Sequence, residues 1–152
     1  MSKSGILIAA FFVVGGAVVI WQQLQPSSSM PGHTMTTPDL SQTEEGAPIA
    51  DVVVPAEFSA NAQLGKRVFD GACAACHGAN AAGQNGVAPP LVHKIYEPSH
   101  HGDMAFVLAA QNGVRAHHWK FGNMPAVEGV TNEDVLNIAA YIRALQRANG
   151  IY

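Results

Sequence analysis

The chain has 152 residues, a length typical of one domain with short appendages. Hydrophobic residues make up 48% of the chain and charged residues only 12%, partly because Lys3 is the single charged side chain among the first 24 residues. The formal net charge of −3 is too small to indicate a nucleic acid or an acidic protein as the partner.

The N-terminal part of the chain has the composition of a membrane span. The run Ile6–Trp21 contains 16 residues without a charged or polar side chain. Extended to Leu24 it reaches about 20 residues, roughly one bilayer crossing, and Trp21 lies where an interfacial aromatic residue is expected. We therefore predict that residues 1–24 are an uncleaved N-terminal membrane anchor. The alternative is a cleaved secretory signal, although no small-x-small cleavage site follows promptly.

The distribution of basic residues predicts the orientation of this anchor. Lys3 precedes the hydrophobic run, and no Lys or Arg follows until Lys66. Because positive residues flanking a span stay in the cytoplasm, the N-terminus is expected inside and everything after Trp21 outside.

Residues 25–56 have the composition of a flexible linker, rich in proline and serine. They show no hydrophobic periodicity before Val52–Val54, which we expect to form either a short strand or a staple onto the next domain. A flexible chain of this length has a reach on the order of 35 Å. Met30, His33 and Met35 carry thioether and imidazole groups that suit copper. The alternative is an ordinary polar linker that happens to contain them.

Three helices are predicted in the remainder of the chain. Residues 60–72 place Leu64, Val68 and Phe69 near one face, and this helix leads directly into Cys73. A second helix is expected over 103–112. The last helix starts at Thr131 or Asn132, with a capping box in Thr131–Asp134, and ends at Gly150.

The motif Cys73-Ala74-Ala75-Cys76-His77 follows the first of these helices. Two cysteines three positions apart on a helical turn present their sulfurs on one face. Cys-x-x-Cys-His is typical of c-type haem attachment, with two thioether bonds and an imidazole ligand to iron. This motif uses both cysteines, so no disulfide framework remains. The alternatives are a redox dithiol, which lacks its usual βαβ context here, and half of a zinc site, which lacks a second ligand pair at a familiar spacing.

Residues 57–152 resemble a class I monohaem cytochrome c domain. The resemblance rests on four features in the expected order: a helix containing Gly65 and Phe69, the haem motif, Pro89-Pro90-Leu91, and Asn123-Met124-Pro125 before a terminal helix. It implies an all-α fold of about three to five helices around one covalent haem c. The transmembrane helix and the Pro/Ser-rich linker would precede this domain.

The same resemblance implies roles for individual residues. Cys73 and Cys76 would hold the haem, and His77 would be the proximal iron ligand. The carbonyl group of Pro89 would accept a hydrogen bond from His77, which orients the imidazole and makes it a stronger donor to iron. Gly65, Phe69 and Tyr141 are the candidates for the contact between the N- and C-terminal helices.

Met124 is the predicted distal iron ligand. It lies in a loop with Gly, Asn and Pro neighbours before the last helix, where a thioether can be placed over the haem. Met104, at the start of a predicted helix, is expected to be a core or surface residue.

Histidines are the rivals of Met124. His117 and His118 lie a few residues upstream, and bis-histidine ligation would give a lower reduction potential than histidine with methionine. The other expectation for His117, His118 or Trp119 is a position near the haem propionates, where Arg115 could pair with one. His100 and His101 are expected to be solvated loop residues, and no role is assigned to His33 or His93.

With both axial positions filled and no catalytic constellation in the sequence, we expect an electron-transfer protein rather than an enzyme. The resemblance implies a bacterial carrier in the inner membrane, with its haem domain in the periplasm. It would take electrons from a quinol-cytochrome c oxidoreductase and deliver them to a terminal oxidase or a photosynthetic reaction centre. The alternatives are the electron-accepting subunit of a periplasmic dehydrogenase, a haem sensor or peroxidase whose Met124 is displaced, and a copper- or zinc-handling protein.

Basic residues near the haem edge are candidates for steering redox partners. Seven basic and seven acidic residues from Ala56 onward cancel, so no strongly basic docking face is evident. The steering candidates are Lys66, Arg67, Lys94, Arg115 and Lys120.

Overall fold

The structure is a computed structural model that describes residues 15–16 and 35–152. The predicted membrane anchor lies outside the described residues except for Gly15 and Gly16, and so do Met30 and His33. Within the described ranges, no helix is both long enough and apolar enough to cross a membrane.

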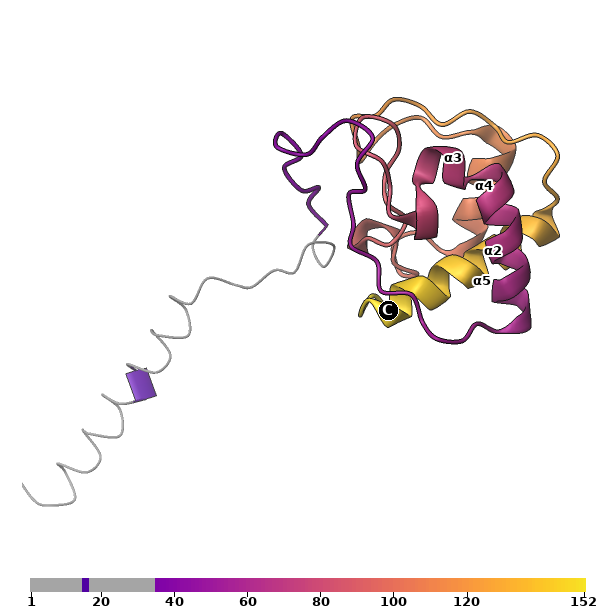
Figure 1. Cartoon of the computed structure of the whole chain (residues 1–152), viewed down its shortest axis with the longest axis horizontal. Helices are drawn as coiled ribbons and strands as arrows, with labels where there is room; N and C mark the ends of the chain where they lie inside the picture. The colour runs from indigo at the N-terminus through magenta and orange to yellow at the C-terminus, as the bar shows by residue number, and fades with distance from the viewer. Residues whose placement is uncertain (1–14, 17–34) are drawn as a thin grey trace, which may run out of the picture.

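The domain is built from α-helices connected by long loops (Figure 1). The described part of the chain contains no named strand, only two isolated β-bridges. The sequence predicted the bounds of the helices at 60–72 and 103–112 correctly, and both predictions are confirmed. The helices are α2 (Ala60–Ala72), α3 (Ala74–His77), α4 (Asp103–Asn112) and α5 (Asn132–Ala148), with short 3-10 helices η1 (Ala79–Ala81) and η2 (Lys94–Tyr96).

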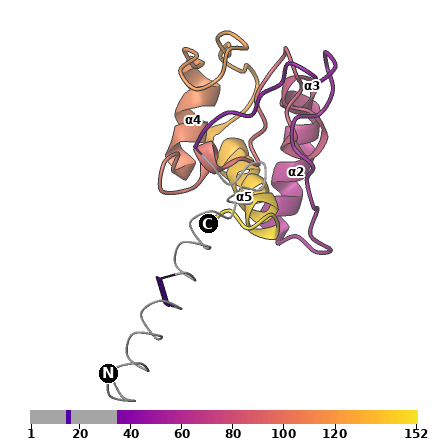
Figure 2. The same ribbon diagram turned by 90° about the vertical axis from the view of Figure 1, so that its left-hand side faces the viewer.

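Helices α2 and α5 cross each other at Gly65, as both views of the ribbon show (Figures 1 and 2). A Cβ atom on Gly65 would lie 1.8 Å from the carbonyl oxygen of Asn137, so only glycine permits this approach of the two backbones. Gly65 is therefore the small residue that the resemblance implies at the helix crossing.

Aromatic rings fill the rest of this crossing. Phe69 and Tyr141 are fully buried, and their ring centroids lie 5.6 Å apart. Phe58 packs on the other side of Tyr141 at 5.3 Å. The Tyr141 hydroxyl donates a hydrogen bond to Asn80 Oδ1 at 3.2 Å, which connects the crossing to the loop after the cysteine motif. Burial raises the pKa of Tyr141 to about 12, so the phenol stays protonated as a donor.

Helix α5 begins with the predicted capping box, which is confirmed. The Thr131 hydroxyl accepts a hydrogen bond from the Asp134 N–H at 3.1 Å, and the Asp134 carboxylate accepts one from the Thr131 N–H at 2.9 Å. These bonds satisfy backbone donors that a helix N-terminus otherwise leaves unpaired.

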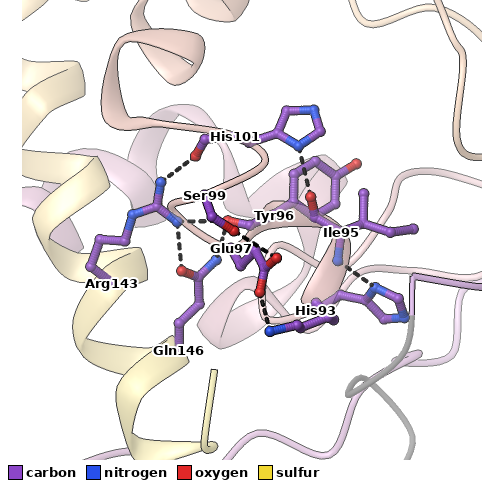
Figure 3. A network of polar contacts seen from close by, with 9 residues as sticks. His93, Ile95, Tyr96, Glu97, Ser99, His101, Arg143 and Gln146 are labelled. Carbon is purple, nitrogen blue, oxygen red and sulfur yellow. Dashed lines mark hydrogen bonds and ion pairs between the residues drawn. The ribbon is translucent and has the colours of Figure 1, made fainter. Parts of the chain in front are cut away.

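A buried arginine ties α5 to the loop that precedes α4 (Figure 3). Arg143 donates to the Tyr96 carbonyl at 2.6 Å, to Asp103 Oδ1 at 2.8 Å and to the His101 carbonyl. Gln146, also buried, donates to the Tyr96 carbonyl at 2.9 Å. The loop before α4 is therefore held in place by polar side chains of α5.

The second half of the predicted linker lies on the domain. The Gly46 N–H donates to the Asn85 carbonyl at 2.8 Å, and the Ala50 N–H donates to the Ala82 carbonyl at 2.9 Å. Val53 forms no strand. Its N–H and carbonyl instead bond the side-chain amide of Asn149 at 2.9 and 2.8 Å, so this segment acts as a staple against the end of α5.

Candidate haem-binding site

The cysteine motif lies at the joint between two helices. Cys73 caps the C-terminus of α2, where its N–H donates to the Phe69 carbonyl at 2.8 Å. The single turn of α3 starts at the next residue, and the His77 N–H closes it by donating to the Cys73 carbonyl at 2.9 Å. Both thiols and the imidazole are thus presented within one helical turn, and all three residues line the same cavity. Burial raises the pKa of the Cys73 thiol, with a further contribution from Cys76.

The imidazole of His77 is oriented by the Pro89 carbonyl group. Its Nδ1 lies 2.9 Å from this carbonyl oxygen, which can only accept, so Nδ1 donates and Nε2 keeps its lone pair. Burial lowers the pKa of His77, and the hydrogen bond to Pro89 opposes this shift. The neutral imidazole that a metal requires is therefore favoured. The contact that the resemblance implies is present, while the roles of the two residues at an iron stay a prediction.

The loop after α3 is shaped so that Pro89 can reach His77. Gly83 has a φ of +74°, and a Cβ atom there would lie 2.4 Å from the Pro90 nitrogen. Its N–H donates to the His77 carbonyl at 2.7 Å. The Gln84 side-chain amide donates to the carbonyls of Ala75 and Cys76 at 2.8 and 3.0 Å. These contacts fix the C-terminal end of α3 against the Pro89 segment.

The cavity has a volume of about 580 Å³, within the range of pockets that enclose a small molecule. Within the described part of the chain, no Asp, Glu, Lys or Arg lines it. Its wall is mostly aliphatic and aromatic, including residues of α4, α5 and the loop between them. The apolar lining includes Leu91, Phe106, Leu108, Val127, Val130, Val135, Ile138 and Ile142.

Met124 lines this cavity, and Met104 does not. The backbone of Met124 pairs with Val114: each N–H donates to the other carbonyl, at 3.0 and 2.9 Å. Gly113, with a φ of +72°, allows this pairing, because a Cβ atom there would lie 2.5 Å from the Met124 carbonyl oxygen. Met104 is 58% exposed on α4, as the sequence suggested for a residue with no ligand role.

The residues present fit a haem. The cavity combines two thiols, an oriented imidazole and a thioether with an apolar wall that suits a porphyrin. Trp119 also lines the cavity. Its buried indole N–H interacts with the Tyr96 hydroxyl and opposes the upward shift that burial gives to the pKa of that phenol.

Residues 62–146 match the family model for cytochrome c. The chain belongs to the cytochrome c family. It is a class I monohaem cytochrome that carries one covalently bound haem c, and it is an electron-transfer protein rather than an enzyme. Cytochrome c6 from Chlorolobion braunii is similar to this cytochrome, with 39% identity over 89 residues, which are 55% of this chain and 89% of that relative. No solved structure gives a significant match.

His117 and His118 lie near the haem cavity, as the sequence suggested, but their approach to His100 and His101 was not predicted. His100, His101 and His118 form a group whose nitrogen atoms are close enough to share a metal ion. His101, His117 and His118 also line the haem cavity. The expectation that His100 and His101 are merely solvated is incomplete, since His101 is half-buried and bonded to the Ile95 carbonyl. Two adjacent His-His pairs were the signal available in the sequence.

Two of the basic steering candidates are engaged in ion pairs. Lys66 Nζ lies 2.6 Å from Asp70 Oδ2, and Lys94 pairs with Glu97. Their charges are therefore partly neutralised locally, in keeping with the balance of charges over the domain.

Proposed function

We propose that this cytochrome is a membrane-anchored carrier of single electrons between membrane redox complexes. One observation carries the electron-carrier part of this proposal: the Cys73–His77 motif and Met124 line one apolar cavity whose wall has no charged side chain among the described residues. Such a site suits an iron that changes its oxidation state while its ligands stay in place.

Each predicted site residue has a distinct task in this proposal. Cys73 and Cys76 hold the haem through thioether bonds, and His77 ligates the iron through Nε2. Pro89 orients that imidazole by accepting the Nδ1–H bond. Met124, held in place by the backbone pairing with Val114, would supply the second protein ligand to the iron. Histidine with methionine ligation supplies a high potential and leaves no open position for a substrate.

The N-terminal sequence supports the membrane location. Lys3 precedes the uncharged run Ile6–Trp21 and a long segment without basic residues follows it, which supports a haem domain outside the cytoplasm. In a bacterium this location is the periplasmic face of the inner membrane. Tethering confines the domain near membrane complexes at a local concentration on the order of millimolar. Quinol-cytochrome c oxidoreductase as donor and a terminal oxidase or reaction centre as acceptor are the partners of this proposal.

Optical spectroscopy of the purified full chain tests the ligand assignment. We expect a c-type α-band on reduction and the weak near-infrared band that ferric haem shows with a sulfur ligand. Met124→Ala should remove the weak band and lower the reduction potential. Met104→Ala, a change of the same side chain outside the cavity, should leave both unchanged. A weak band that survives in Met124→Ala would refute the assignment.

Fractionation of cells tests the anchor. The haem-stained chain should remain in the membrane pellet after carbonate washing, with an intact mass that includes residues 1–24. A soluble periplasmic product that starts after residue 24 would show a cleaved signal and would end the anchored-carrier proposal. The ligand assignment would survive that result, so the two experiments are independent.

A further inference from the structure

Four histidines from two loops converge beside the haem cavity. His100 and His101 precede α4, and His117 and His118 lie between α4 and Met124. The ring centroids of His100 and His118 lie 5.1 Å apart, and those of His101 and His118 lie 5.4 Å apart. His117 packs on His118 with a centroid distance of 4.4 Å. The histidine cluster, as we call these four residues, therefore joins segments far apart in the chain.

The nitrogen atoms of three members have the spacing of metal ligands. One ligand nitrogen from each of His100, His101 and His118 lies within 4.8 Å of the others. The Nε2 atoms of His100 and His118 are 3.2 Å apart. Two nitrogens bound to one tetrahedral Zn²⁺ at about 2.0–2.1 Å lie roughly 3.3 Å from each other. This pair thus already has the separation that a shared ion requires.

The third member is oriented by its surroundings. His101 Nδ1 lies 2.7 Å from the Ile95 carbonyl oxygen, so Nδ1 donates and Nε2 is left with a lone pair. Metal-binding histidines commonly have this arrangement, in which a carbonyl fixes the tautomer and the ring orientation. Figure 3 shows the bond together with the hydrogen bond from Arg143 to the His101 carbonyl. The loop that carries His101 is therefore anchored to α5 and is not free to rearrange.

The charge of the cluster favours a transition metal over a hard cation. Burial and the neighbouring histidines lower the pKa of His101 and of His118, which keeps the rings neutral at neutral pH. Arg143 adds to this effect on His101. The nearby Glu97 carboxylate is already engaged by Lys94 and by the Ser99 hydroxyl at 2.7 Å. Imidazole ligands without a carboxylate suit Zn²⁺, Cu²⁺ and Ni²⁺ but not Ca²⁺ or Mg²⁺.

We propose that His100, His101 and His118 form a binding site for one divalent transition-metal ion at the rim of the haem cavity. Three imidazole nitrogens hold the ion, and water fills the remaining position. The bound ion connects the loop before α4 to the segment that leads into Met124, so it ties together two parts of the cavity wall. This site is separate from the Cys73, His77 and Met124 positions, and it does not depend on the proposed carrier function.

Calorimetric titration of the oxidised, chelator-treated full-length holoprotein with Zn²⁺ at pH 7.5 tests the proposal. We expect one site per chain. His118→Ala and His100→Ala should each weaken binding by about tenfold or more, since even the loss of an outer-shell partner of a metal ligand costs that much. His33→Ala is the matched control, because it removes a histidine from the Met30–Met35 segment instead, and binding should be unchanged. Zn²⁺ should also raise the melting temperature of the wild type and of His33→Ala.

The His100→Ala variant keeps the test decisive if His118→Ala fails to fold. His100 is exposed and does not line the haem cavity, so its substitution removes no residue of the cavity wall. Absence of saturable Zn²⁺ binding, or equal affinity in the wild type and His100→Ala, would overturn the proposal. Loss of binding in His33→Ala would move the site to the segment around Met30 and would also overturn it.

Discussion

Burial in the fold strongly alters the protonation of His93. Only 2% of it is exposed, and burial lowers its pKa from 6.5 to about 4. Its Nδ1 accepts a hydrogen bond from the Ile95 N–H at 3.2 Å and so caps η2, while Nε2 has no partner among the described residues. The edge of the ring meets Trp119 at a centroid distance of 5.3 Å. His93 is thus a structural residue held in the neutral form.

This environment predicts a pH dependence of stability. Because the pKa of His93 is lower in the folded state, the unfolded chain binds more protons between pH 6.5 and about pH 4. The free energy of unfolding is therefore not reduced by His93 above pH 6.5. It falls by on the order of 1–3 kcal/mol as the pH falls from 6.5 toward 4. Denaturant titrations at several pH values should show that the free energy of unfolding changes less with pH in His93→Gln than in the wild type.

His33→Gln is the control for this experiment, because His33 lies in the predicted linker and should leave the pH dependence unchanged. Parallel stability profiles of His93→Gln and the wild type would contradict the burial argument. A constant loss of stability in His93→Gln would then reflect packing alone.

At the scale of elements, the contact between α2 and α5 holds the domain together. Gly65 lets the backbones touch, and Phe69 and Tyr141 fill the space beside the contact. Helix α2 contains a second glycine, Gly71, where an added Cβ atom would meet nothing within 4 Å. The same substitution can therefore be made at two positions of one helix, one packed against another backbone and one with open space around it.

We expect Gly65→Ala to destabilise the protein and Gly71→Ala to be neutral or stabilising. At Gly65 the new methyl group would overlap the Asn137 carbonyl, and a forced separation of the helices costs roughly 3 kcal/mol or more. At Gly71 the gain in helix propensity is about 0.5–1 kcal/mol. Thermal unfolding followed by circular dichroism measures both. Equal effects of the two substitutions would refute the close crossing.

The elements also show which features the sequence can predict. The bounds of α2 and α4 and the start of α5 follow from local signals such as the capping box at Thr131 and the stop at Gly113. The haem motif and the Pro89 and Met124 segments were found because short motifs in a fixed order carry them. The histidine cluster and the bonds between Val53 and Asn149 depend on contacts between distant segments, which no local pattern encodes.

At the scale of the whole molecule, the cavity is large for the domain that encloses it. A volume of about 580 Å³ lies among residues of α2, α4 and α5 that would otherwise form one core. Two clusters of buried hydrophobic residues flank it, one centred on Tyr141 and Ile142 and the other on Val107 and Val135. The haem that the family carries joins these two clusters, because each contributes residues to the wall.

Removal of the haem should therefore unfold most of the domain. In the double variant Cys73→Ala/Cys76→Ala the cofactor has no covalent attachment, and an unfilled cavity of this size costs several kcal/mol. A small domain has little stability to spare. We expect reduced helical circular dichroism and no cooperative thermal transition. A sharp transition in the haem-free variant would show that the apoprotein core is self-sufficient.

The joining of α2 to α5 also sets an order of events during biosynthesis. A ribosome makes Cys73 and Cys76 well before Tyr141, so the two thiols are synthesised before the helix that will pack against α2. Contact between segments so far apart in the chain also carries the entropic cost of closing the long loop between them. We therefore expect both thiols to be accessible for haem attachment until the C-terminal segment, fastened to Val53 by Asn149, has been made.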